Sequence, residues 1–212
     1  MRPHYWSRAK RELSAADATM GNLIAQHPRV ALQSRGEPFN TLARSIVGQQ
    51  ISVKAADAVW QRLMSACVAM EPATLLRKRA STLRACGLSE RKVEYMRDLA
   101  RHFQSGRIDP TQFAALSDED IIAQLTDIRG IGRWTAEMFL IFNLLRPNVL
   151  PLDDLGLLKA VGLHYFDGAK AESLVRAQGR ERVTALAQRW APWRSVATWY
   201  LWRSLDPVAV EY

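Results

Sequence analysis

The segment from Leu125 to Ala136 constrains the fold more than any other part of this 212-residue chain. Two glycines, Gly130 and Gly132, are flanked on both sides by apolar, helix-forming residues. Glycine permits a tight turn and a close approach of another molecule to the main chain. Arg133 opens the next helix, whose first N–H groups lack partners within the helix and can point at an anion. The pattern predicts two helices joined by a hairpin, which either binds a phosphate or merely caps the first helix.

Helical periodicity covers most of the chain and strand alternation is nearly absent, so we predict an all-α fold. An apolar stripe predicts a helix that begins at Pro38 and continues to Leu63. Further expected helices run from Ser89 to Phe103, from Ser117 to near Thr126, from Arg133 to about Leu145, and onward from Asp153 or Asp154, and Pro192 separates the last two helices.

The composition and net charge of the chain narrow the classes of function that it could have. The formal net charge of +8 fits a polyanionic partner. Two cysteines, Cys67 and Cys86, exclude a disulfide framework and a four-cysteine metal site, and we expect both to be small buried hydrophobes. The four histidines show no ligand spacing, so we expect neither zinc nor a cofactor. The sequence contains no apolar run of the length of a signal peptide or membrane span, so we expect a cytoplasmic location without membrane attachment.

Two adjacent carboxylates, Asp153 and Asp154, stand where a helix is expected to begin. Aspartate is a preferred N-cap and favours the positive end of the helix dipole, so capping alone explains one of them. The second could stabilise a developing positive charge or position a water molecule.

Long amides and aromatic rings supply two further signals. Gln49 and Gln50 interrupt an apolar helical face, where a long amide suits a protein–DNA surface or a solvated helix end. Between Lys170 and Arg203 there are seven basic and two acidic residues. This segment also contains four tryptophans, most of them expected in the core, and basic residues interleaved with aromatic rings suit contact with phosphates and stacked bases.

Five motifs together resemble the helix-hairpin-helix DNA glycosylase superfamily, and within it the 3-methyladenine DNA glycosylase II type. In chain order they are Ile46 to Ser52, Gly87-Leu88-Ser89 with Lys92, Leu125 to Ala136, Pro151 to Leu157, and Trp190 to Trp202. The resemblance implies two helical lobes flanking a DNA-binding cleft. It divides the chain into an N-terminal helix packed on the C-terminal lobe (1–38), a lobe with the hairpin (39–146) and a C-terminal lobe with the catalytic aspartate (147–212).

The resemblance also implies roles for individual residues. Asp154 fits the frame of the catalytic carboxylate better than Asp153, which is left as the N-cap or a helper. Gln50 corresponds to the residue that fills the gap left by a flipped base. Substrate contacts are expected from Gln49, Trp134, Met138 and Trp202, with Trp199 as the alternative wall to Trp202. DNA contacts are expected from Ser52, Arg129, Gly130, Ile131, Gly132, Arg133 and Thr135, and the hairpin carbonyls of this superfamily often hold a monovalent cation.

The implied activity is hydrolysis of the N-glycosidic bond of alkylated purines in double-stranded DNA, by a monomer without a cofactor. Trp134 stands where bifunctional branches carry a catalytic lysine, and without an amine no Schiff base with the sugar can form. Met138 replaces a tyrosine of some relatives, and their extra N-terminal mixed domain has no counterpart here, so the substrate range is less defined than the reaction. Two alternatives stay open, a glycosylase for another damaged base and a non-catalytic DNA-binding module.

Overall fold

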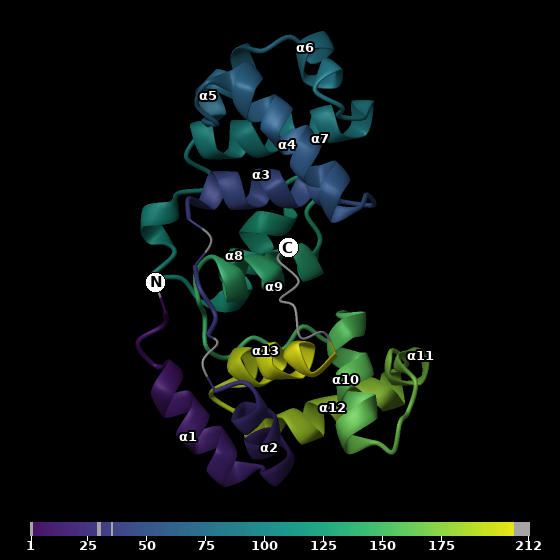
Figure 1. The fold of residues 1–212 in the computed structure, drawn as a ribbon. Helices are drawn as coiled ribbons and strands as arrows, with labels where there is room; N and C mark the ends of the chain where they lie inside the picture. The colour runs from purple at the N-terminus through teal and green to yellow at the C-terminus, as the bar shows by residue number, and fades with distance from the viewer. Residues whose placement is uncertain (1, 29–30, 35, 206–212) are drawn as a thin grey trace. The chain divides into compact units, whose positions relative to one another are not determined.

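A computed structural model of the protein describes residues 2–28, 31–34 and 36–205. Within these ranges all regular structure is helical and no strand occurs, which confirms the all-α class (Figure 1). None of the described helices combines the length and the apolar character needed to cross a membrane. The described residues divide into two compact units, 36–139 and 2–34 with 140–205, and the division falls inside helix α9 (Arg133–Phe142). The three-segment division expected from the sequence stays a prediction.

The unit of residues 36–139 is built around α7 (Glu90–Gln104), against which α3 (Pro38–Gly48) and α5 (Pro72–Arg77) pack (Figure 1). Ser89 caps α7 by accepting a hydrogen bond from the Lys92 N–H, so the predicted start is confirmed. The other described elements of this unit are α4 (Val53–Cys67), α6 (Ala80–Ala85), a 3₁₀ turn (Pro110–Gln112) and α8 (Asp118–Thr126). The two cysteines are buried in it as free thiols, as predicted.

The single helix predicted from Pro38 to Leu63 is wrong, because the chain makes α3 and α4 with a break over residues 49–52. Gln50 has φ +59°, a left-handed conformation that no α-helix contains. Ser52 then starts α4, since its hydroxyl accepts a hydrogen bond from the Ala55 N–H at 3.3 Å. Apolar periodicity runs through this break and therefore does not reveal it.

The predicted end of the hairpin's second helix near Leu145 is also wrong. Helix α9 ends at Phe142, because Leu145 has φ +54° and the Arg146 N–H turns back to the Leu140 carbonyl at 2.9 Å. The helix thus ends through a turn within the chain before Pro147 can stop it.

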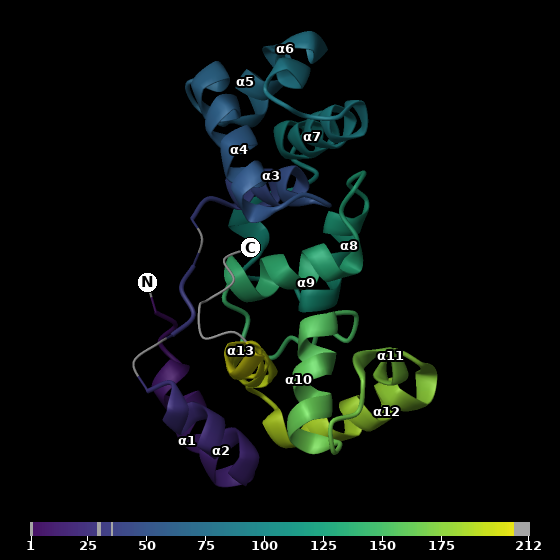
Figure 2. The ribbon, with the colours of Figure 1, turned by 45° about the vertical axis from the view of Figure 1, so that its right-hand side comes forward.

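The other unit is centred on α13 (Arg194–Leu205), which contacts α10 (Leu155–Tyr165), α1 (Trp6–Ala16) and α2 (Ala18–Gln26). Every residue from Ser195 to Leu201 is buried, as expected of a helix surrounded by others. Figure 2 shows α11 (Ala171–Leu174) and α12 (Ala177–Leu186) beside α10, and a 3₁₀ turn (Ala187–Trp190) follows α12. The predicted N-terminal helix is thus two helices that pack on α13, separated at Asp17, whose φ of −149° is extended.

Asp17 is a buried carboxylate that joins distant parts of this unit. One oxygen caps α2 by accepting from the Met20 N–H at 2.9 Å. The other accepts from the Tyr165 hydroxyl at 3.1 Å and the Trp190 indole N–H at 3.2 Å. Burial, and then the charge of Asp17, raise the pKa of Tyr165, so this hydroxyl keeps its proton and remains a donor.

Replacing Asp17 with alanine is expected to lower the free energy of unfolding by about 2–4 kcal/mol, because it removes a cap and leaves two buried donors without their acceptor. Urea unfolding of the wild type and the variant measures the difference. Asp17→Asn is the control: it keeps an oxygen for the cap and should lose less. An alanine variant within about 0.5 kcal/mol of the wild type, the usual range of surface substitutions, would contradict this role.

Candidate functional site

The hairpin between α8 and α9 is the first candidate element. Ser117 caps α8, accepting from the Asp120 N–H at 3.2 Å, and α8 ends at Thr126, as predicted. In the turn, the Ile131 N–H bonds to the Ile128 carbonyl at 3.1 Å, and both side chains are buried. Gly132 is exposed, and its carbonyl accepts the Ala136 N–H of the first turn of α9. Buried isoleucines therefore anchor the turn while its glycines present backbone.

Helix α7 holds this hairpin through two side chains that the sequence did not single out. A Cβ on Gly130, which has φ +84°, would lie 2.3 Å from Cδ2 of Tyr95. Asp98 accepts a hydrogen bond from the Arg129 N–H at 2.9 Å. Tyr95 and Asp98 are three residues apart and so share one face of α7. From the sequence, this spacing could have predicted that Tyr95 and Asp98 share a face of the helix. It could not have predicted that the hairpin, more than thirty residues later, packs against that face.

Gln49 is bonded to the hairpin as well. Its side-chain amide donates to the Gly130 carbonyl at 2.8 Å. Lys92 donates to the main-chain carbonyls of Val47 and Gln49 at 2.8 and 2.7 Å, and burial lowers the pKa of its amine. Gln50, next to them, is exposed. Lys92 and Gln49 thereby fix the break between α3 and α4 against the hairpin.

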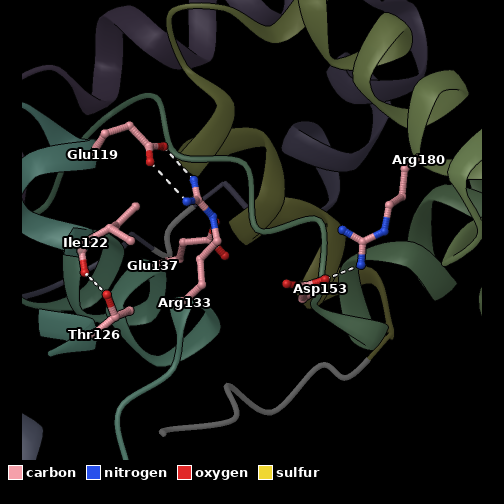
Figure 3. A network of polar contacts seen from close by, with 7 residues as sticks. All are labelled: Glu119, Ile122, Thr126, Arg133, Glu137, Asp153 and Arg180. Carbon is pink, nitrogen blue, oxygen red and sulfur yellow. Dashed lines mark hydrogen bonds and ion pairs between the residues drawn. The ribbon is translucent and has the colours of Figure 1, made fainter. Parts of the chain in front are cut away.

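Arg133 opens α9, as predicted, but its guanidinium is engaged within the protein. Both terminal nitrogens bind the Glu119 carboxylate, at 2.5 and 3.0 Å, and Nε binds Glu137 at 3.1 Å (Figure 3). The hydrogen bond with Glu119 raises the pKa of Arg133, and the same bond lowers the pKa of Glu119. The hairpin accordingly offers backbone N–H groups rather than this side-chain charge.

The remaining residues predicted on this side differ in exposure. Trp134 is partly exposed, whereas Thr135 and Met138 are only 8% and 6% exposed. Arg129 is exposed and lies 4.0 Å from Glu94, and Ser52 is exposed while it caps α4. Contacts of Thr135 and Met138 with a ligand stay predictions.

The second candidate element is the acidic turn before α10. Asp154 is 5% exposed, and its Oδ1 accepts hydrogen bonds from the Leu157 N–H at 2.6 Å and the Trp202 indole N–H at 2.8 Å. Trp202 is partly exposed, and its ring stacks on Phe142 with centroids 5.6 Å apart. Trp199, the alternative wall, is buried and meets Trp6 edge-to-face at 5.3 Å. Within this unit the structure therefore brings together Asp154 and Trp202.

The expectation that Asp153 is the N-cap is wrong. Asp154 has the extended φ and ψ of a cap, −80° and 111°, and its own carboxylate takes the Leu157 N–H. Asp153 is exposed and binds Arg180 of α12 (Figure 3). One aspartate thus both caps the helix and carries the buried charge.

The monovalent cation implied by the resemblance would lie on the hairpin carbonyls. Two of these already accept hydrogen bonds, Gly130 from Gln49 and Ile128 from Ile131. Among the described residues, no cluster of three or more histidine, cysteine or acidic side chains could hold a metal ion. A monovalent cation on the hairpin carbonyls stays a prediction, and we assign no chemical step to one.

This combination of a hairpin and a buried aspartate at a helix start agrees with the match of residues 43–185 to the HhH-GPD superfamily of base excision DNA repair proteins, and the chain belongs to that superfamily. More particularly, it is 34% identical to DNA-3-methyladenine glycosylase 1 of Schizosaccharomyces pombe, over 93% of this chain and 87% of the relative.

Solved structures agree with this relationship. A DNA-3-methyladenine glycosidase from Bacillus halodurans is 35% identical, with a TM-score of 0.84 over 96% of this chain and 92% of the other. The 3-methyladenine DNA glycosylase of S. pombe in complex with abasic DNA is 31% identical, with a TM-score of 0.75 over 97% of this chain and 99% of the other.

Proposed function

We propose that the protein is a monofunctional DNA glycosylase that hydrolyses the N-glycosidic bond of alkylated purines in double-stranded DNA. The observation that carries this proposal is Asp154, a buried carboxylate beside the partly exposed indole of Trp202 in a chain of this superfamily. The names of the relatives, DNA-3-methyladenine glycosylases, support alkylpurines as the substrate class. A single chain is sufficient for this reaction, so we expect the protein to be a monomer.

The chemistry follows from the substrate. Alkylation at N3 or N7 gives the purine a positive charge, so the base accepts the electron pair of its bond to C1′ and leaves as a neutral molecule. Asp154 stabilises the cationic sugar that remains and orients a water molecule, whose oxygen bonds to C1′ as it loses a proton. Trp202 stacks on the flipped base, because a cationic ring over an indole face is favourable by about 0.5–2 kcal/mol. Trp134 carries no amine, so the enzyme leaves an abasic site and does not cut the strand.

The hairpin and the break before α4 hold the DNA in this proposal. Backbone N–H groups of Gly130 and Gly132 bind a phosphate near the lesion, while the exposed Gln50 fills the gap left by the flipped base. In this proposal Gln49 positions the hairpin, because its amide donates to the Gly130 carbonyl.

Base release from methylated duplex DNA tests the proposed function. The wild type is expected to release methylpurine, with strand breaks appearing only after alkali treatment. Breaks without alkali would instead indicate a lyase. Salt-sensitive binding without release from any alkylated substrate would indicate a DNA-binding module and overturn the proposal.

Binding to duplex DNA that contains an uncleavable abasic-site analogue is expected to weaken steeply with salt. Each contacted phosphate releases condensed counterions, which gives a slope of about −0.9 in log K against log salt for each contact. Fluorescence anisotropy measures this slope when the salt concentration is varied between about 50 and 200 mM, a range wide enough to resolve it. An affinity that did not change with salt would contradict phosphate binding.

A further inference from the structure

The carboxylate of Asp154 accepts more hydrogen bonds than a helix cap requires. One hydrogen bond from the cap side chain to a first-turn N–H completes a helix start, and Ser52, Ser89 and Ser117 each cap a helix in this way from exposed positions. At Asp154 the Leu157 N–H fills this role at 2.6 Å. The Trp202 indole N–H adds a second donor to the same oxygen at 2.8 Å. Two donors on Oδ1 fix the rotation of the carboxylate and hence the direction of both its oxygens.

Gly156 gives the indole room to reach this oxygen. A Cβ on Gly156 would lie 3.1 Å from Oδ1 of Asp154, 3.3 Å from Cδ1 of Trp202 and 3.4 Å from its Nε1. The distances to Oδ1 and Cδ1 are tighter than ordinary contacts of a Cβ, so alanine would push the indole and the carboxylate apart. Glycine is an unfavourable choice within a helix, and here its missing side chain is what allows the contact. Phe142, stacked on Trp202 at an interplanar angle of 13°, sets the plane of the ring.

We propose that Trp202 is a positioning residue for Asp154, acting through its indole N–H, and that Gly156 provides the space for this bond. The inference rests on the proposed function, in which Asp154 faces a positive charge at C1′. With both donors on Oδ1, Trp202 holds the Asp154 carboxylate in one orientation toward that charge. This role is separable from stacking on the flipped base, which uses the face of the ring rather than its N–H.

The separating variant is Trp202→Phe, which keeps an aromatic face and removes the donor. Single-turnover base release is expected to slow about 10- to 100-fold, the range for loss of a hydrogen bond to a charged group. Affinity for the abasic-site analogue should stay near that of the wild type, so the loss falls on the rate of the chemical step. Gly156→Ala should give the same pattern. Combined with Trp202→Phe it should add little, because both changes act on one bond.

The matched control is Trp193→Phe, which removes another indole–carboxylate bond, from Trp193 to Glu12 at 2.6 Å. It should leave the rate of base release unchanged. A wild-type rate in Trp202→Phe would overturn the proposal, as would an equal loss of rate in Trp193→Phe.

A readout without catalysis separates this inference from the proposed function. In ¹⁵N-labelled protein the Trp202 indole N–H signal should move in Asp154→Asn, which changes its acceptor, and stay in place in Asp153→Asn. If the wild type releases no base, the proposed function fails and the positioning role fails with it, even where the signal moves. If the wild type is active and the signal stays in place in Asp154→Asn, only the inference fails.

Discussion

Replacing Asp154 with asparagine is expected to slow base release by about 100-fold or more while leaving the fold and DNA binding intact. Asparagine is as good an N-cap as aspartate, so its side-chain oxygen can still accept the Leu157 N–H and α10 should form. The variant loses the negative charge that would face the sugar cation. Single-turnover release of methylpurine, with thermal unfolding and abasic-DNA affinity in parallel, measures the effect.

Asp153→Asn is the matched control, one residue away. Asp153 is exposed and its ion pair with Arg180 lies at the surface, where such pairs contribute about 0–1 kcal/mol. Its rate should stay close to that of the wild type. If Asp154→Asn were fully active, the catalytic role would pass to Asp153 or the protein would need a mechanism without either carboxylate.

Gly130→Ala is expected to damage the hairpin and with it DNA binding. Alanine at φ +84° is strained by about 1–3 kcal/mol, and its Cβ would overlap the Tyr95 ring, 2.3 Å from Cδ2. The turn must therefore shift, which moves the backbone N–H groups away from the phosphate and disturbs the bond from Gln49. We expect at least a tenfold loss of affinity for the abasic-site analogue, together with a lower unfolding temperature.

Gly132→Ala separates this effect from the loss of glycine as such. A Cβ there would meet nothing within 4 Å, and Gly132 lacks the positive φ of Gly130. The unfolding temperature of Gly132→Ala should match that of the wild type. Its affinity for the abasic-site analogue should fall much less than that of Gly130→Ala. If Gly132→Ala lost as much affinity for DNA as Gly130→Ala, both glycines would be needed to leave room for DNA. The Tyr95 contact would then not explain the need for glycine at position 130.

Local signals predicted the helix starts well. Pro38, Ser89 and Ser117 each begin a helix where the sequence places it, because proline at the first turn and serine caps act within a few residues. Helix ends and breaks were predicted less well, since the left-handed residues Gln50 and Leu145 lack the glycine that usually marks such positions.

The candidate site required contacts between residues far apart in the chain. The sequence selected Arg133 and Gln49 by residue type, yet Glu119 and the Gly130 carbonyl determine what those side chains do. Similarly, two adjacent aspartates could not be ranked by spacing alone, because Trp202, forty-eight residues later, supplies the donor that distinguishes Asp154.

If the protein acts as proposed, the Lys92 amine affects how quickly it can search DNA for lesions. It holds two carbonyls at the break before α4, so Gln50 is set in its left-handed conformation when the protein folds. Ordering a residue costs about 1–2 kcal/mol of conformational entropy, and a loop ordered only on DNA would bear that cost at every base pair tested. In the proposed function, a Gln50 that is already ordered would test each intact base pair without this entropic cost, so many base pairs could be tested quickly.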